Sequence, residues 1–212
     1  VAVPKEIVRN ENRVALVPDT VGKLVQSDIE IAVESGAGQA ASFFDNEYEE
    51  AGATVVADMD ALYKGAEVVL KVQAPVFNDA VDRHEVEVLD EGSVLISFLQ
   101  PLTNLSLVKM LVDKSITSFS MEMIPRVARA QKMDALTSMS SISGYKATLI
   151  ASNLLGKYLP MMMTAAGTLA PAKGLVLGAG VAGLQAIATS RRLGAVVEAF
   201  DVRPAVKEQV ES

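Results

Sequence analysis

The feature that most constrains this chain is residues 173–204, KGLVLGAGVAGLQAIATSRRLGAVVEAFDVRP. An apolar run, GLVL, leads into three glycines with the spacing G-x-G-x-x-G, at Gly178, Gly180 and Gly183. An amphipathic stretch then reaches Gly194, and a second apolar run, AVVEAF, follows it. This order predicts a strand, a tight turn, a helix and a parallel strand, the unit from which dinucleotide-binding sheets are built.

Each conspicuous residue of this unit has a physical role in holding a dinucleotide. Gly178 permits the tight turn, Gly180 lets the backbone approach a diphosphate, and Gly183 lets the helix beginning near Val181 pack against the strand. The amino end of that helix offers free N–H groups and a positive dipole to the phosphates. The competing interpretation is a glycine turn that binds no ligand.

An acidic residue ends the second strand and indicates which dinucleotide is preferred. Asp201 can accept hydrogen bonds from a ribose diol and would repel a 2′-phosphate, so we expect NAD(H) rather than NADP(H). Val202 and Arg203 follow directly and would border the same sugar. The positive charge of Arg203 weakens the inference from Asp201 alone.

Short apolar runs alternate with amphipathic stretches along the whole chain, which predicts an α/β fold with parallel sheets covered by helices on both faces. We expect a Rossmann-like domain over residues 1–132 and a long connecting helix within 133–160, about residues 133–157. Residues 161–212 would begin a second Rossmann-like domain. That domain is incomplete here, because a dinucleotide fold needs more strands than these residues provide.

Composition excludes several classes of site. The chain has 212 residues, a net charge of −7, no cysteine and a single histidine, His84, which we expect at the surface. Disulfides, thiolate metal sites and multi-histidine metal sites are therefore excluded, and an acidic chain is a poor match for nucleic acid. No apolar run is long enough to span a bilayer. The apolar stretch YLPMMMTAAG, residues 158–167, is expected to pack at a domain or subunit junction.

A second polar stretch, RVARAQKMDALTS at residues 126–138, precedes the predicted long helix. If this stretch is helical, Gln131 and Asp134 share one face, and Ser138 lies further along it. An ordinary charged helix start explains the same pattern, so spacing alone does not assign a ligand here.

The stretches MMMTAAGTLAPAKGLVLGAGVAGLQAIATSRRLGAVVEAFDVRPAVKEQVES, RVARAQKMDALTSMSSISGYKA and PKEIVRNENRVALVP resemble the NAD(H)-binding component of proton-translocating NAD(P) transhydrogenases. The resemblance implies two Rossmann-like domains with a cleft between them. It also implies hydride transfer between NADH and NADP⁺, with NADP(H) on a partner component and a membrane component that moves protons. It further implies a homodimer located peripherally at the cytoplasmic face of the inner membrane, or on the matrix side in mitochondria.

By the same resemblance, Arg126, Gln131 and Asp134 lie beside the nicotinamide and act in catalysis. The full set of positions expected to contact the cofactor is Arg126, Val127, Ala128, Arg129, Gln131, Thr137, Gly178, Gly180, Val181, Gly183, Asp201, Val202 and Arg203. No metal ligand is expected.

Two other functions stay open. Alanine dehydrogenases share the ENRVALVP start, and the positions that matter for their chemistry match Arg13, Lys71 and Gln100, the last being a histidine in those enzymes. Gln100 cannot donate and recover a proton as histidine does, which argues against reduction of pyruvate. Arg13 and Lys71 would then be expected to pair with acidic side chains. The remaining alternative is a non-catalytic docking fragment.

Overall fold

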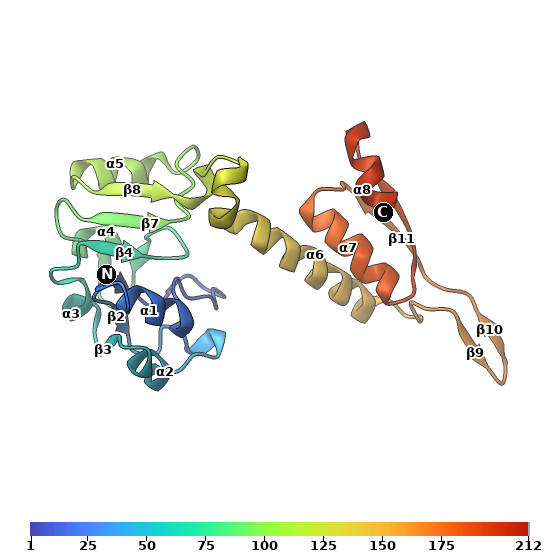
Figure 1. The fold of residues 1–212 in the computed structure, drawn as a ribbon, viewed down its shortest axis with the longest axis horizontal. Coiled ribbons are helices and arrows are strands. Elements are labelled where there is room, and N and C mark those ends of the chain that lie inside the picture. The colour runs from blue at the N-terminus through green and yellow to red at the C-terminus, as the bar shows by residue number, and fades with distance from the viewer. Residues whose placement is uncertain (212) are drawn as a thin grey trace. The chain divides into compact units, whose positions relative to one another are not determined.

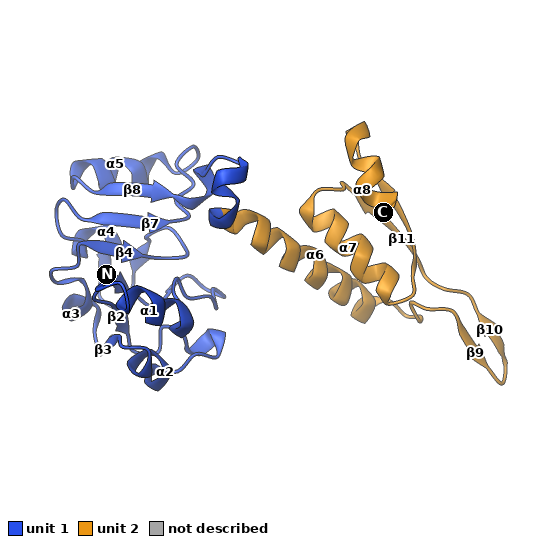
Figure 2. Ribbon diagram, viewed as in Figure 1, with its two compact units in different colours: residues 1–133 blue, residues 134–212 orange. Residues whose placement is uncertain are grey.

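The computed structural model describes residues 1–211, and the chain divides into two compact units (Figure 2). The first unit covers Val1–Met133 and the second begins at Asp134. The long helix predicted as a connector has its contacts inside the second unit rather than forming a separate part.

The first unit alternates strands and helices from its first residue onward (Figure 1). Its strands are β1 (Ala2–Val3), β2 (Ala32–Glu34), β3 (Thr54–Val56), β4 (Val68–Leu70), β5 (Phe77–Asn78), β6 (Arg83–His84), β7 (Val94–Ser97) and β8 (Thr117–Ser120). Its helices are α1 (Pro18–Val25), α2 (Asp45–Glu50), α3 (Met59–Tyr63), α4 (Glu85–Val88) and α5 (Leu105–Asp113), with short 3-10 helices η1 (Gln39–Ala41), η2 (Met121–Met123) and η3 (Ala128–Met133).

Six of these strands form one parallel sheet in the order β3-β2-β1-β4-β7-β8. The chain builds outward from β1 in one direction and then returns to add β4 on its other side. The switch of direction therefore lies between β1 and β4, and such points are where open α/β sheets leave room for side chains and ligands at the strand ends. The predicted parallel α/β architecture is confirmed.

Successive side chains of a strand point to opposite sides of the sheet, so each central strand contributes to a core on either face. Ala2 belongs to a core cluster with residues of α3, α4 and α5, whereas its neighbour Val3 belongs to a second cluster with residues of α1 and α2. Both residues are completely buried. Cover on both faces explains why the central strands β1 and β4 contain only apolar residues.

Local signals fix most helix starts in this unit. Pro18 opens α1, and the Asp58 side chain caps α3 by accepting a hydrogen bond of 2.8 Å from the Ala61 amide. The antiparallel pair β5–β6 was not predicted. The prediction that His84 is a surface residue is wrong, because His84 is half-buried and its Nδ1 caps α4 by accepting from the Val86 amide at 3.2 Å.

The second unit carries the glycine-rich segment. It comprises α6 (Ala135–Leu154), β9 (Met162–Thr164), β10 (Gly167–Leu169), β11 (Lys173–Leu177), α7 (Val181–Arg192), β12 (Val196–Phe200), η4 (Pro204–Val206) and α8 (Lys207–Glu211). Strands β11 and β12, which α7 connects, pair in parallel as predicted. The long helix is shorter than predicted at both ends, since Asp134 caps its start and Leu155 its end.

The methionine-rich stretch forms an antiparallel hairpin, β9–β10, that extends away from the other elements of its unit (Figure 1). Every residue of both strands is exposed, and Met163 is 80% exposed. Packing of this stretch inside a core is therefore not seen among the described residues. Its place at a junction stays a prediction.

Candidate functional site: the glycine loop and Asp201

Two of the three motif glycines, Gly178 and Gly183, occupy positions that disfavour any other residue. Gly178 adopts a φ of +96°, in the region that favours glycine, and its amide donates to the Phe200 carbonyl at 2.7 Å. A Cβ on Gly183 would lie 1.8 Å from the Gly178 carbonyl oxygen. Helix α7 therefore sits directly on the turn, and the loop keeps the shape that the sequence predicted.

Gly180 is the N-cap of α7, so the helix begins at Val181 with its amide groups directed at the space in front of the loop. The first intrahelical bond runs from the Leu184 amide to the Gly180 carbonyl, at 2.8 Å. The amides before it have no partner within the helix, and the helix dipole adds partial positive charge there. Loop and helix end together form a cradle that suits a diphosphate.

Helix α6 packs closely against the start of α7 and holds it in place. A Cβ on Gly144 would lie 2.0 Å from the Ala182 carbonyl oxygen, so only glycine permits this approach. Further along, the Thr148 hydroxyl lies 3.2 Å from the Ala186 carbonyl and 3.3 Å from the Ser190 hydroxyl. The amino end of α7 is thus fixed by tertiary contacts and not only by the glycine loop.

Asp201 lies beside the loop and is held by several donors. Its Oδ2 accepts from the Ala179 amide at 2.8 Å, and its Oδ1 accepts from the Arg203 amide at 2.8 Å. The Arg203 guanidinium adds Nε–Oδ1 and Nη2–Oδ2 contacts, both 3.0 Å. Hydrogen bonds from Arg203, and then from the Ala179 amide, hold the pKa of Asp201 well below its ordinary value. The carboxylate is therefore charged at neutral pH and fixed next to the phosphate cradle.

A cavity of about 450 Å³ opens next to this carboxylate. Its charged lining residues are Asp201, Arg203, Lys207 and Glu211, and its apolar ones include Phe200, Pro204 and Val206. A largely apolar hollow with a few fixed polar groups is the usual form of a small-ligand site, and its size accommodates a nucleoside.

The second polar stretch is not one helix: it covers the short 3-10 helix η3 and the start of α6. Arg126, Val127, Ala128, Arg129 and Gln131 are exposed and lie in or just before η3, whereas Asp134 caps α6. Gln131 therefore belongs to η3 and Asp134 to the start of α6, and the shared face predicted for these two residues stays a prediction.

Asp134 is fixed by the helix it caps. Its Oδ1 accepts from the Thr137 amide at 2.9 Å, and its Oδ2 lies 2.6 Å from the Thr137 hydroxyl. Ser138 is exposed on the same first turn. Because α6 is locked onto α7, Asp134 and Thr137 keep a defined position relative to the glycine loop. For Arg126 to Gln131, proximity to the cofactor stays a prediction.

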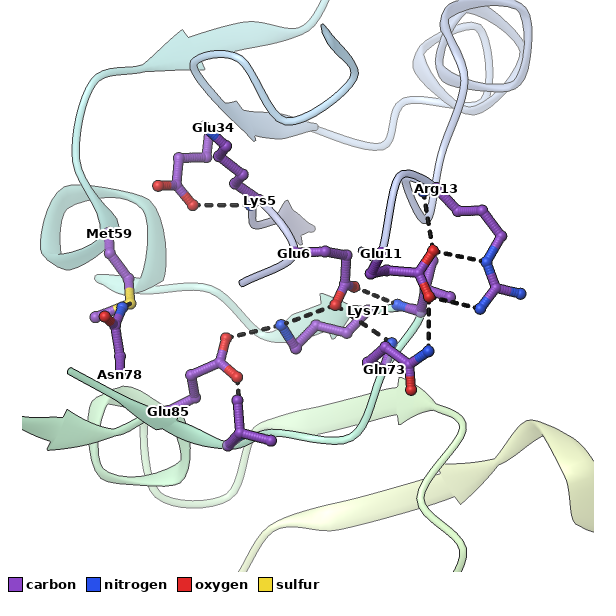
Figure 3. A network of polar contacts seen from close by, with 12 residues as sticks. Lys5, Glu6, Glu11, Arg13, Glu34, Met59, Lys71, Gln73, Asn78 and Glu85 are labelled. Atoms are coloured by element: carbon purple, nitrogen blue, oxygen red, sulfur yellow. Dashed lines mark hydrogen bonds and ion pairs between the residues drawn. The ribbon is translucent and has the colours of Figure 1, made fainter. Parts of the chain in front are cut away.

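The first unit holds a second polar cluster, at the carboxyl ends of β1 and β4 (Figure 3). The Lys71 ammonium lies 2.7 Å from Glu85 Oε1 and 3.4 Å from Glu6 Oε2, and all three side chains are almost completely buried. Arg13 forms a two-pronged pair with Glu11, at 2.6 and 2.8 Å, and Gln73 also donates to Glu11. The prediction that Arg13 and Lys71 pair with acidic side chains is confirmed.

Two of the three carboxylates that face these cations, Glu6 and Glu11, differ in their environment. Burial raises the pKa of Glu6, although the Lys71 charge opposes the shift. Hydrogen bonds from Arg13 lower the pKa of Glu11 to about 2. The sequence offered no signal for Glu85, because its partner Lys71 is 14 residues away and only the sheet brings the two together.

Two absences concern the described part of the chain. No helix within residues 1–211 has the length and apolar character needed to cross a bilayer. In the same residues, no three histidine or acidic side chains lie close enough together to share a metal ion.

Comparison with known families agrees with this arrangement. Residues 2–143 match the alanine dehydrogenase/PNT N-terminal domain, and residues 147–212 match the C-terminal domain of the same family. The chain therefore belongs to the alanine dehydrogenase/PNT family.

Individual relatives come from both branches of the family. The chain is 45% identical over its full length to NAD(P) transhydrogenase subunit alpha of Cereibacter sphaeroides, and it spans 39% of that protein. It is 31% identical to alanine dehydrogenase of Methanococcus maripaludis, over 95% of this chain and 53% of the relative. The crystal structure of transhydrogenase from Sinorhizobium meliloti matches 99% of this chain and 60% of its own, with a TM-score of 0.91 and 46% identity. The chain thus spans less than two thirds of the length of each of these relatives.

Proposed function

We propose that this chain is part of the NAD(H)-binding component of a proton-translocating NAD(P) transhydrogenase. The observation that carries the proposal is the glycine loop with Asp201 fixed beside it by the Ala179 amide. Gly178 has a φ that favours glycine, and a Cβ on Gly183 would clash with the Gly178 carbonyl, which is the pattern expected of a dinucleotide-binding turn. The higher identity to a protein named as a transhydrogenase subunit favours this branch of the family.

In this proposal the loop amides and the first turn of α7 hold the diphosphate, and Asp201 accepts from the adenosine ribose. Gln131 orients the nicotinamide carboxamide, while Arg126 and Asp134 shape the field around the ring. A hydride passes directly from NADH to NADP⁺ held by a partner component. The chain's own task is to fix one ring within a narrow donor–acceptor geometry.

The same proposal includes the partners, the oligomeric state and the location of the component. A membrane component would couple hydride transfer to proton movement, and this component would be a homodimer lying peripherally at the cytoplasmic or matrix face of the membrane. Both the partners and the location rest on the family resemblance and on the names of the transhydrogenase relatives.

Alanine dehydrogenase activity is the second candidate, and the polar cluster of the first unit argues against it. Glu6 and Glu85 engage the buried Lys71 ammonium, so this cation is not available for a substrate carboxylate without rearrangement. Gln100 also supplies no proton donor of the kind that imine reduction needs. Oxidation of NADH by the intact protein in the presence of pyruvate and ammonia would favour this candidate.

The cofactor preference is tested by titrating the intact protein with NADH and with NADPH while following nicotinamide fluorescence. We expect binding of NADH with a micromolar-range Kd and no measurable binding of NADPH, because the Asp201 carboxylate repels a 2′-phosphate. Asp201→Asn, which removes that charge, should narrow the difference between the two nucleotides. Equal affinity of the unaltered protein for both would remove the role assigned to Asp201.

The role of the polar stretch is tested by Gln131→Leu in the assembled transhydrogenase. We expect hydride transfer to slow by about tenfold or more while the Kd for NADH stays within about twofold, since the side chain orients the ring rather than anchoring the nucleotide. Lys132→Met, at the exposed neighbouring position, is the matched control. A transfer rate for Gln131→Leu within about twofold of the control, roughly 0.4 kcal/mol, would make Gln131 a bystander.

A further inference from the structure

The carboxylate that would receive the ribose is already engaged by a side chain of its own chain. Nε and Nη2 of Arg203 reach Oδ1 and Oδ2 of Asp201, each at 3.0 Å. The paired geometry presents one donor to each oxygen, which is how a guanidinium binds a carboxylate most specifically. A ribose diol would present its two hydroxyl donors to the same two oxygens.

The two kinds of contact to Asp201 differ in how easily a ligand can replace them. The Ala179 and Arg203 amides belong to the backbone of the turn and orient the carboxylate. The Arg203 guanidinium, in contrast, lies on the solvent side, since the Arg203 side chain is 58% exposed and that of Asp201 only 8%. The guanidinium therefore covers most of the surface through which solvent or a ligand would reach the Asp201 carboxylate.

The guanidinium also lies near the phosphate cradle. Nη2 of Arg203 is 4.0 Å from the point that a Cβ on Gly180 would occupy. Gly180 is the residue whose missing side chain leaves room for a diphosphate. Arg203 thus occupies the space between the ribose acceptor and the amino end of α7, along the line that an adenosine diphosphate would follow.

We propose that Arg203 is a latch on the nucleotide site: its guanidinium covers the Asp201 carboxylate, and the adenosine ribose has to displace it. The inference rests on the proposed NAD(H) function and adds a residue that sets affinity. Displacement costs the guanidinium–carboxylate pair, and an exposed pair of this kind corresponds to a factor of about 2–5 in an equilibrium constant. Arg203 therefore reduces the affinity for the ribose by about that factor.

The test uses Arg203→Met in the intact protein, with neutral adenosine as the competing ligand against NADH. Adenosine carries the diol and lacks phosphate, so any attraction between Arg203 and phosphate does not enter. We expect the inhibition constant of adenosine to fall by about 2–5-fold in Arg203→Met. 2′,3′-Dideoxyadenosine has no diol, so its inhibition constant against NADH should be the same for Arg203→Met and for the unaltered protein.

Arg191→Met, at an exposed arginine in the last turn of α7, is the matched control and should leave both inhibition constants unchanged. Unchanged or weaker adenosine binding in Arg203→Met would overturn the latch while leaving the proposed function intact. Absence of NADH binding in the unaltered protein would instead refute the proposed function, and the latch with it.

Discussion

Gly183→Ala is expected to lower the affinity of the intact protein for NADH by roughly ten- to a hundredfold. The added Cβ would lie 1.8 Å from the Gly178 carbonyl oxygen, and real Cβ atoms keep at least 3.0 Å from such neighbours. Either the turn or the start of α7 has to move, and overpacking of this kind costs about 1–3 kcal/mol. The displaced amides would no longer converge on the diphosphate. Titration of nicotinamide fluorescence measures the loss.

Gly174→Ala is the control for that experiment. Gly174 lies in β11 of the same unit, and a Cβ there would meet nothing within 4 Å. The affinity of Gly174→Ala for NADH should match that of the unaltered protein. If Gly183→Ala binds NADH as tightly as Gly174→Ala, the close packing of helix on turn is not needed for the nucleotide, and the proposed cradle is wrong.

Lys71→Met is expected to destabilise the first unit by about 3–5 kcal/mol, because it leaves two buried carboxylates without their cation. Glu6 and Glu85 are 3% and 2% exposed in their side chains, so water cannot replace the ammonium. Methionine keeps most of the volume of lysine, and the effect therefore reports the charge. Urea denaturation of the intact protein, followed in the transition of the first unit, measures the change.

The loss of folding stability caused by Lys71→Met should depend on pH. A carboxyl group whose pKa is raised in the folded state, as burial raises that of Glu6, adds stability below its unfolded pKa of 4.5. That stability is lost as the pH rises through the folded value. Removing the opposing Lys71 charge raises the folded pKa further, so the deficit should shrink as the solution is acidified.

Lys109→Met, which breaks the exposed pair with Asp113, is the control and should cost less than about 1 kcal/mol. If Lys71→Met does not fold, Glu85→Gln gives the same information, because it removes one carboxylate and leaves Lys71 paired with Glu6. A loss below about 1 kcal/mol for Lys71→Met would mean that the cluster is solvated and not a buried ion network.

Sequence reasoning succeeded where the physical cause is local. Pro18 opens a helix because its ring fixes φ and its missing N–H is not needed there, and Asp58 caps α3 through an amide three residues away. The spacing of the three motif glycines predicted the turn between β11 and α7 for the same reason. These interactions act within a few residues, so the local sequence is enough to predict them.

It failed where a partner lies elsewhere in the chain or where a helix boundary depends on packing. The long helix was predicted over about residues 133–157, yet it spans only Ala135–Leu154, between the caps at Asp134 and Leu155. His84 in a charged stretch suggested a surface residue, but the fold half-buries it and uses its ring as a helix cap.

The sequence by itself determined the succession of strands and helices, the glycine turn and the acidic residue beside it, because backbone preferences and capping are short-range. Only the tertiary structure decided that β1 and β4 lie side by side, which buries Lys71 between Glu6 and Glu85. It alone placed Asp201 beside the Ala179 amide, which lies 22 residues earlier in the chain. The physical reason is that the strength of a charge pair depends on distance and burial, and both follow from how distant segments pack.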